Sequence, residues 1–230
     1  MKHIDDNYRY ERKFVISALT PHEVETELAS HPAMFGEIYH QRFVNNIYFD
    51  SIGFRSYLDN LDGLTARRKI RIRWYGDLFG RIGAPVLECK IKRDLLGRKE
   101  SYPLRAFTLD TNCDIRVLLE SLDGAELPPA LREQLLVVRP VLLNRYSRKY
   151  FRSADGNFRV TIDTDLASYQ IDSYNNLFLH KTPYDHHVIL ELKYNSNVSD
   201  EADLIATLFP FRITKSSKYV GGIEELYVRL

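Results

Sequence analysis

The 230-residue sequence contains two cysteines, one tryptophan and no long apolar run. Cys89 and Cys113 form neither a CxxC pair nor a zinc-ligand spacing, which suits a reducing compartment. No stretch approaches the roughly 18 apolar residues that a membrane-spanning helix requires, and the amino terminus has no apolar signal core. We therefore expect a cytoplasmic protein with no membrane span in this chain, and we leave open whether it has a membrane or accessory partner.

An excess of charge of either sign is also missing, since the net charge is only +1 at pH 7. A generally basic surface of the kind that coats nucleic acid is therefore absent, and any strong cationic site has to be local. Neither an internal repeat nor a linker rich in proline, glycine or serine interrupts the chain. With 44% hydrophobic and 27% charged residues, the chain is expected to form a single domain over residues 1–230.

The most informative pattern lies in two neighbouring stretches, residues 67–75 and 86–93, which have the form of a β-hairpin. Successive side chains of a strand point to opposite faces, so each stretch has one apolar face and one charged face. The charged rows contain Lys69, Arg71 and Arg73 in the first stretch and Glu88, Lys90 and Lys92 in the second. Like charges that face one another destabilise a sheet, so such a row requires open water or a polyanion.

Further strands and several helices are indicated along the rest of the chain. The same alternation of apolar and charged residues recurs in residues 8–17, 158–163 and 188–194, while strands are also expected at 39–50, 97–104 and 141–152. Thr20 opens a helix with a capping box that includes Glu23, and Ser199 is expected to cap another. Short helices are expected at 114–122 and 129–137, whereas Gly221 and Gly222 are interpreted as a turn.

Strands with one apolar and one charged face, combined with these helices, predict the α+β fold class. Helices would cover the apolar faces, which leaves the charged faces turned toward one another in a closed or nearly closed antiparallel β-barrel with peripheral helices. Burial of so many cations without partners is prohibitive, so the interior would need a bound polyanion and compensating carboxylates. The alternative is an open sheet whose charged faces are simply exposed to solvent.

Seven fragments of the chain occur in the order found in a known family: YERKF, KIRIRWYG, LECKIKR, RYSRKYF, FRVTIDTDL, LELKY and KSSKY. With these fragments the chain resembles the triphosphate tunnel metalloenzymes, and among them the catalytic domain of the vacuolar transporter chaperone (VTC) polyphosphate polymerases. The resemblance covers nearly the whole chain. It implies a tunnel of β-strands that binds a triphosphate together with a divalent metal, Mn²⁺ or Mg²⁺.

The resemblance also implies roles for charged residues inside those fragments. It implies catalytic roles for Lys13, Arg71, Arg73, Lys90, Arg148 and Arg159, metal binding by Glu191, and substrate binding by Lys193, Lys215, Lys218, Glu11 and Glu88. Arginines fork onto phosphate oxygens, and lysines act as mobile point charges. Glu11 and Glu88 could instead be counterions of neighbouring lysines, and Lys193 could be a solvated strand charge. Lys215 and Lys218 are expected in a loop.

One position distinguishes two branches of the superfamily that the chain resembles. The branch of thiamine triphosphatases and class IV adenylate cyclases begins with Glu-x-Glu-x-Lys, and Arg9 stands where its first Glu would be. Replacing an acid with a base favours phosphate binding over metal binding, and so favours the polymerase-like branch. The resemblance therefore implies an enzyme that transfers the γ-phosphate of ATP to a growing inorganic polyphosphate chain.

Other functions remain open at this point. A triphosphatase of the same fold would use water as the acceptor, and a non-catalytic module would bind polyphosphate or a nucleotide without turnover; Glu191 argues modestly against the module. Nucleic acid is not an expected partner, because the aromatic residues fall mostly on the apolar faces. His186 and His187 would point to opposite faces of a strand, which argues against a metal shared between them.

Overall fold

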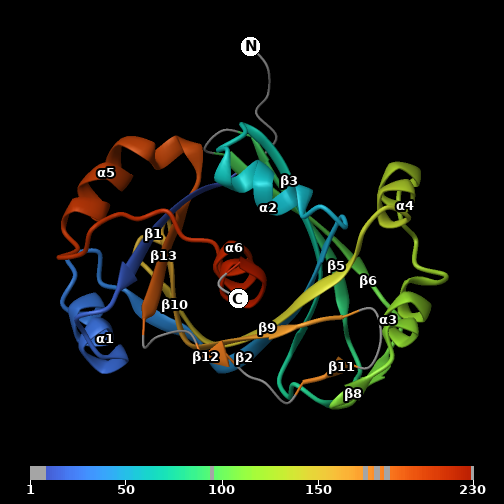
Figure 1. Cartoon of the computed structure of the whole chain (residues 1–230). Coiled ribbons are helices and arrows are strands. Elements are labelled where there is room, and N and C mark those ends of the chain that lie inside the picture. The colour runs from blue at the N-terminus through green and yellow to red at the C-terminus, as the bar shows by residue number, and fades with distance from the viewer. Residues whose placement is uncertain (1–8, 94–95, 173–175, 179–181, 184–186, 229–230) are drawn as a thin grey trace.

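The computed structural model describes residues 9–93, 96–172, 176–178, 182–183 and 187–228. Its largest element is a nine-stranded antiparallel sheet that curls into a ring when viewed along its axis (Figure 1). The hydrogen-bonded strands follow the order β1 (Tyr10–Ile16), β13 (Val188–Tyr194), β10 (Arg159–Gln170), β9 (Arg139–Arg152), β2 (Gly36–Asp50), β3 (Ala66–Tyr75), β5 (Val86–Arg93) and β6 (Leu96–Pro103), and β12 (Thr182–Pro183) pairs with β10.

The two edge strands of this sheet, β1 and β6, meet at one bridge. The backbone N–H of Arg9 donates to the carbonyl of Gly97, and the N–H of Gly97 donates to the carbonyl of Arg9, each at 3.0 Å. No continuous ladder joins β1 to β6 among the described residues, so the sheet is nearly closed but not closed. The expected α+β class and the barrel-like antiparallel architecture are therefore confirmed, with an incomplete seam.

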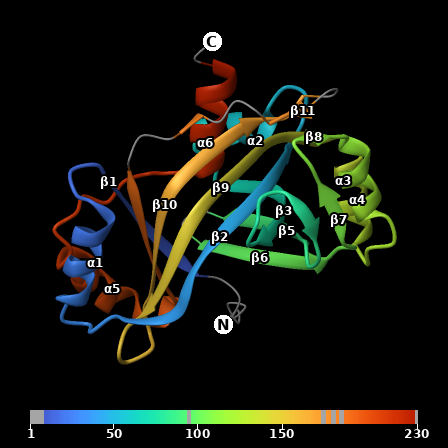
Figure 2. The same ribbon diagram turned by 90° about the horizontal axis from the view of Figure 1, so that it is seen from below.

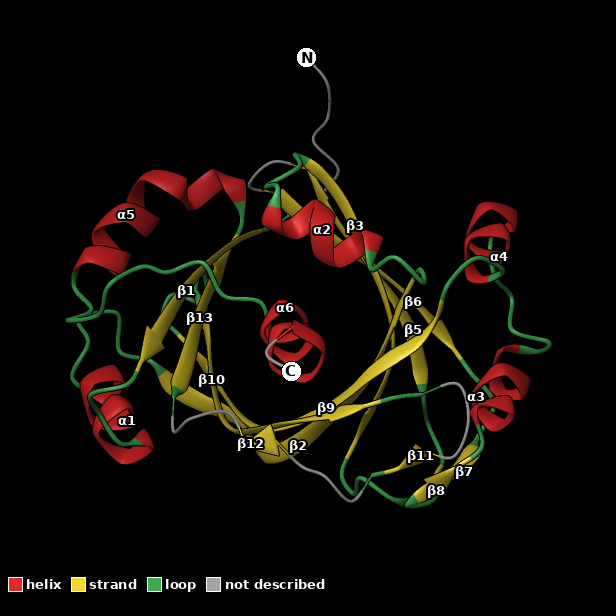
Figure 3. Ribbon diagram, in the orientation of Figure 1, coloured by secondary structure: helices red, strands yellow, loops and turns green. Residues whose placement is uncertain are grey.

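Helices α1 (Pro21–Ala29), α3 (Ile115–Leu122), α4 (Pro129–Leu135) and α5 (Ser199–Thr207) lie outside the ring (Figure 3), and the apolar faces of the strands pack against them. Phe14 and Leu190 share one apolar core with Leu28 of α1 and Ala202 of α5. On the other side of the ring, Ile72 and neighbouring strand residues share a second core with α3 and α4. The outward apolar rows thus bury their side chains under helices, as the alternation predicted.

Local signals explain where several elements begin. The hydroxyl of Thr20 accepts a hydrogen bond from the N–H of Glu23, and the Glu23 carboxylate accepts one from the N–H of Thr20, which confirms the capping box. The expected cap at Ser199 is wrong. A 3₁₀ turn, η1 (Ser196–Val198), leads directly into α5, so Val198 occupies the cap position and Ser199 is the first helical residue.

The remaining strands are short, and three long strands, β2, β9 and β10, extend beyond their predicted limits. Two small sheets pair β4 (Gly80–Ile82) with β7 (Phe107–Leu109) and β8 (Asn112–Cys113) with β11 (Asn176–Leu177). β10 continues to Gln170 past a bulge between Thr164 and Ala167, which a sequence pattern of period two does not reveal. Across the described residues, no helix combines the length and the apolar character needed to cross a membrane.

The carboxyl-terminal helix α6 (Lys218–Ile223) lies inside the outline of the ring, and the views of Figures 1 and 2 place it at one end of the sheet near α2 (Arg55–Leu61). It continues into the π-helical turn η2 (Glu224–Val228). Tyr219 and Ile223 of α6 pack with Tyr48 of β2 and Leu142 of β9. The glycines expected to form a turn are therefore helical. Gly222 is in close contact with Leu142, so the helix covers this end of the ring.

Candidate functional site

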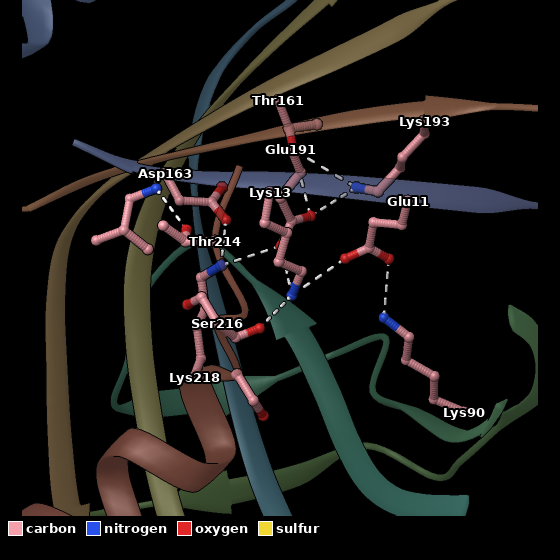
Figure 4. A network of polar contacts seen from close by, with 12 residues as sticks. Glu11, Lys13, Lys90, Thr161, Asp163, Glu191, Lys193, Thr214, Ser216 and Lys218 are labelled. Carbon is pink, nitrogen blue, oxygen red and sulfur yellow. Dashed lines mark hydrogen bonds and ion pairs between the residues drawn. The ribbon is translucent and has the colours of Figure 1, made fainter. Parts of the chain in front are cut away.

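Ion pairs between strands that are not neighbours show that the charged rows face the inside of the ring. Glu11 of β1 contacts Lys90 of β5 at 3.0 Å, although β6 lies between these strands. Lys218 of α6 reaches Asp163 of β10 at 2.6 Å. The charged faces that the alternation defined are therefore turned toward one another, and they form a connected network on the inner face (Figure 4).

Glu191 lies at the centre of this network. Its Oε2 is 2.7 Å from Nζ of Lys193 and 3.2 Å from Nη2 of Arg148, while its Oε1 is 3.3 Å from Lys218 and 3.4 Å from Lys13. Burial opposes ionisation of this carboxyl group. The cations around it, Lys193 foremost, outweigh burial and hold the pKa of Glu191 well below its ordinary value. Glu191 is therefore a carboxylate at neutral pH.

Asp163 is a second buried carboxylate on the same face. Arg148 donates to it through Nε at 2.5 Å and Nη2 at 2.6 Å, and Lys218 approaches its Oδ2 at 2.6 Å. Burial raises the pKa of Asp163, but Arg148 and Lys218 more than reverse the effect and lower it. No role in the site was predicted for Asp163 from the sequence. The alternation could have indicated it, because Asp163 lies four residues after Arg159 and therefore on the same charged face of β10.

Glu88 neutralises the cations of the central hairpin. It faces Arg71 across the β3–β5 ladder and accepts hydrogen bonds from Nη2 of Arg71 at 2.7 Å and from Lys99 at 2.6 Å. Arg73 lies 3.5 Å from the same carboxylate. Burial opposes ionisation, yet these cations lower the pKa of Glu88 below its ordinary value. The charged row of the hairpin is therefore partly compensated.

Lys69, in the same row, has no such compensation. It faces another cation, Lys90, in the ladder, and its Nζ donates to Oδ1 of Asn60 at 2.9 Å and to Oγ of Ser217 at 2.8 Å. Among the described residues, no carboxylate forms an ion pair with it. Burial, followed by repulsion from Lys90 and Lys13, lowers the pKa of Lys69 to about 6. A bound anion would restore its charge.

Two tyrosines complete the hydrogen bonding of the hairpin arginines. The hydroxyl of Tyr48 accepts from Nη1 of Arg71, and the hydroxyl of Tyr146 accepts from Nη2 of Arg73, both at 3.1 Å. Sequence reasoning missed both residues because it assigned aromatic side chains mostly to the apolar faces. Arg73 also donates from Nε to Asn46 at 2.8 Å. These contacts fix the guanidinium groups, so that their orientation does not depend on the ligand.

The structure brings together most of the residues predicted for the site. The inner-face network contains Lys13, Arg71, Arg73, Lys90, Arg148, Glu191, Lys193, Lys218, Glu11 and Glu88. Glu11 and Glu88 contact lysines as the counterion interpretation requires, without excluding contact with substrate. Lys218 was expected in a loop and is instead the first residue of α6, buried beside Asp163.

Two predicted residues lie outside this network. Lys215 is exposed in the loop before α6, as its loop position implied. Arg159 is exposed at the end of β10 remote from α6, where it lines a small cavity with Arg9, Arg152 and Lys193. Burial, Arg9 and Arg152 lower the pKa of Arg159. Of the histidine pair, His186 lies outside the described residues, so the argument about that pair stays untested.

The donor atoms on the inner face fit a divalent metal only together with a phosphate ligand. Within the described residues, no group of three or more His, Cys, Asp or Glu side chains is close enough to hold a metal ion. Glu11 and Glu191 both contact Lys13. The Oε1 atom of Glu11 lies 3.1 Å from Nζ of Lys13, but it is buried and accepts no hydrogen bond from the described residues. One or two carboxylates plus substrate phosphates are a common donor set for Mg²⁺.

Comparison with known proteins identifies one family and solved structures of similar fold. The profile of a family described as VTC domain matches residues 8–227. None of the curated proteins matches the chain. A solved structure from Vibrio parahaemolyticus, provisionally described as an adenylate cyclase, is similar at 10% identity with a TM-score of 0.52, covering 93% of this chain and 96% of the other. The PH1819 protein of Pyrococcus horikoshii OT3 has 12% identity and a TM-score of 0.48, covering 94% and 96%.

Proposed function

This chain belongs to the VTC domain family, and we propose that it is a polyphosphate polymerase that transfers the γ-phosphate of ATP to a growing polyphosphate chain. The fold shared with the Vibrio protein and the family membership support the coarser statement that the inner face acts on triphosphates or polyphosphates. Polymerase activity is the finer proposal. The charge of the inner face is consistent with it, and Arg9 favours it over the triphosphatase-like branch.

The single observation that carries the proposal is the excess of cations over carboxylates on the inner face. Glu11, Glu88, Asp163 and Glu191 are all ion-paired, and they are outnumbered by the lysines and arginines around them. Lys69 is the clearest sign, because its pKa is lowered to about 6 by burial and neighbouring cations. A row of cations along a strand is neutralised by a ligand that carries several negative charges along its length, as a triphosphate or polyphosphate does.

In the proposed reaction, a terminal phosphate oxygen of polyphosphate attacks the γ-phosphorus of ATP. The new P–O bond forms as the bond to the β-phosphate oxygen breaks, and ADP leaves. Such a nucleophile is already largely ionised near neutral pH, so no general base is required. The protein has to hold the reacting groups in line and stabilise charge on the transferred phosphoryl group.

The residues of the inner face can meet both requirements. Arg71 and Arg73, fixed by Glu88 and by the two tyrosines, present forked donors to phosphate oxygens. Arg148 of β9 and Lys218 of α6 place further positive charge on the same inner face. Glu191 and Glu11 are the residues that would hold Mg²⁺ or Mn²⁺ together with the phosphates. That ion would neutralise charge on the transferred group.

The direct test is incubation of the protein with ATP and Mn²⁺, followed by separation of polyphosphate, orthophosphate and ADP. We expect metal-dependent release of ADP with accumulation of phosphate polymer. Orthophosphate in amounts equal to ADP, without polymer, would identify a triphosphatase of the same fold. Binding of ATP without turnover would identify a binding module. The Arg71→Met variant is the matched negative control, since it removes a cation at the centre of the proposed site.

A further inference from the structure

Three tyrosines surround the guanidinium group of Arg42 in β2. The carbon Cζ of Arg42 lies 4.4 Å from the ring centroid of Tyr39, 3.9 Å from that of Tyr75 and 4.9 Å from that of Tyr150. Its Nε donates a hydrogen bond to the hydroxyl of Tyr150 at 3.1 Å. We refer to Arg42, Tyr39, Tyr75 and Tyr150 as the tyrosine cluster. None of them was singled out in the sequence.

The strand registers place the tyrosine cluster directly beyond the proposed phosphate site. Arg42 faces Arg148 across the β2–β9 ladder, and Tyr150 lies two residues further along β9. Tyr75 follows Arg73 by two residues on β3, and therefore shares its face. Two residues span about 7 Å along a strand, which leaves room for a sugar between phosphates at Arg148 and a group at Tyr150.

The other end of the ring does not offer comparable access. Leu142, near the beginning of β9, packs with Tyr219 and Ile223 of α6. From this end, β9 runs past Arg148 to Tyr150, so Tyr150 lies on the side of Arg148 that is remote from α6. Figure 2 shows α6 and the carboxyl terminus together at that end. A ligand whose phosphates occupy the network between these ends would extend its remaining part toward the tyrosine cluster.

The cluster is charged, aromatic and open to solvent. Tyr39 is 45% exposed and Tyr75 is 44% exposed. Arg42 forms no ion pair with a carboxylate among the described residues, so its planar cation is held by the three rings and by the Tyr150 hydroxyl. Tyrosine rings and guanidinium planes are the surfaces on which nucleobases stack, and each stacked base contributes roughly 1–3 kcal/mol to binding. A phosphate chain alone would gain little from uncharged rings.

We propose that the tyrosine cluster binds the base of a nucleoside triphosphate whose phosphates lie on Arg73 and Arg148. The inference rests on the proposed function, because it takes the inner face as the triphosphate site. It goes further in assigning to the cluster the selection of a nucleotide over an inorganic triphosphate. Arg42 holds the three rings in place, and the exposed ring of Tyr75 receives the base, since Tyr39 already stacks on His40 with ring centroids 4.4 Å apart.

The chain contains a matched control on the opposite face of the same strand. Phe43 directly follows Arg42, is 39% exposed, and lies under another arginine, Arg145, whose Cζ is 3.8 Å from the ring centroid. Since adjacent residues of a strand point to opposite faces, Phe43 is turned away from the inner face. Phe43→Ala therefore removes an exposed aromatic ring stacked on arginine without touching the proposed base site.

The test compares the affinities of ATP and inorganic tripolyphosphate by calorimetric titration without divalent metal, so that no turnover occurs. We expect Tyr75→Ala to weaken ATP binding roughly tenfold and to leave tripolyphosphate binding unchanged. Tyr75→Phe keeps the ring and should retain the affinity for ATP, while Phe43→Ala should alter neither ligand. None of these substitutions changes a charge, so the electrostatic attraction of the phosphates is constant.

Two results would overturn the inference while the proposed function stands. The first is that Tyr75→Ala binds ATP with the affinity of the wild type. The second is that the wild type binds tripolyphosphate and Tyr75→Ala loses affinity for ATP and tripolyphosphate equally. If the wild type binds neither ligand, the inner face is no triphosphate site, and the proposed function is overturned together with the inference. A melting curve of each variant shows whether it is folded.

Discussion

Single buried charges on the inner face differ sharply in how well they are compensated. Arg71 and Lys69 are two residues apart on the same face of β3, yet Arg71 faces Glu88 while Lys69 faces Lys90. The same strand therefore carries one satisfied ion pair and one cation with a lowered pKa. This contrast makes Lys69 the residue most sensitive to a bound anion, although no role in the site was predicted for it from the sequence.

The first prediction concerns protonation of Lys69 on ligand binding. With a pKa lowered to about 6, Lys69 is largely neutral above pH 7 in the free protein, and a bound triphosphate favours its charged form. Binding should therefore take up a proton, and affinity should fall as pH rises from 6 to 8 by up to about tenfold per unit. Titration calorimetry in buffers of different ionisation enthalpy measures the uptake.

In the Lys69→Met variant this uptake should disappear, whereas the ligand's own titration is the same for both proteins. Lys149→Met is the matched control, because Lys149 is also partly buried on a strand but pairs with Glu25 at 2.7 Å, away from the inner face. Equal proton uptake by wild type and Lys69→Met would show that Lys69 does not sense the anion.

The second prediction distinguishes a metal ligand from a counterion at Glu191. If Glu191 holds the ion, Glu191→Gln should keep triphosphate binding, since Lys13, Lys193, Lys218 and Arg148 remain. Turnover should fall on the order of a hundredfold or more. Titration of Mn²⁺ at saturating ATP compares the two proteins. A normal maximal rate with an unchanged half-saturating metal concentration would remove Glu191 from the metal site and leave it as a counterion.

At the scale of elements, α6 is the feature that decides the form of the site. It contributes Lys218 to the network and covers one end of the ring. Its close approach to β9 depends on glycine, because a Cβ atom at Gly222 would lie 2.7 Å from Cδ2 of Leu142 and 3.0 Å from Oγ of Ser168. Both of these neighbours are fully buried, so neither can move aside easily.

The third prediction is that Gly222→Ala destabilises the protein by about 1–3 kcal/mol. Alanine is the better helix former by roughly 1 kcal/mol, so a net loss of stability has to come from displacement of α6. The same displacement moves Lys218 away from Asp163 and should weaken triphosphate binding. Urea unfolding and calorimetric titration measure the two effects.

Gly53→Ala provides the control for Gly222→Ala, since a Cβ at Gly53 meets no atom within 4 Å. It should leave both stability and binding near the wild-type values. If Gly222→Ala were as stable as Gly53→Ala and bound triphosphate equally well, then α6 would not need its close packing on β9, and the position of Lys218 would not depend on it.

At the scale of the whole molecule, the charges are distributed very unevenly. The net charge is only +1, yet the inner face concentrates cations, and Lys69 forms no ion pair with a carboxylate of the part of the chain that the structure describes. In the absence of ligand these cations repel one another, and a polyanion that binds the native state alone stabilises it by mass action. The stability of the molecule is therefore expected to depend on phosphate ligands.

The fourth prediction follows from this distribution. Tripolyphosphate at about one hundred times its dissociation constant should add about 2.7 kcal/mol to the free energy of unfolding and raise Tm by roughly 5–10 °C. Polyphosphate should act in the same direction. Differential scanning calorimetry at low and constant ionic strength measures the shift. An unshifted wild-type Tm at these concentrations would contradict the presence of a triphosphate site on the inner face.

The sequence alone determined which side chains share a face. Alternation in a strand is a local property with a period of two residues, so the charged rows of β1, β3, β5, β10 and β13 could be read directly. The capping box at Thr20 and the substitution at Arg9 are local in the same sense. These rows left two predictions open, an inward-facing cationic site and an open sheet with solvated charges, and the resemblance to the tunnel enzymes implied which residues form the site.

Only the tertiary structure decided which charges are paired and which are left without a partner. The pairing of Glu191 with Lys218, the placement of Lys69 opposite Lys90 and the rings around Arg42 each depend on register, on the curl of the sheet or on where α6 packs. These arise from contacts between residues distant in the chain, and alternation has no information about them. The physical reason is that a strand fixes the direction of its side chains, whereas their neighbours are fixed by the strands and helices that meet them.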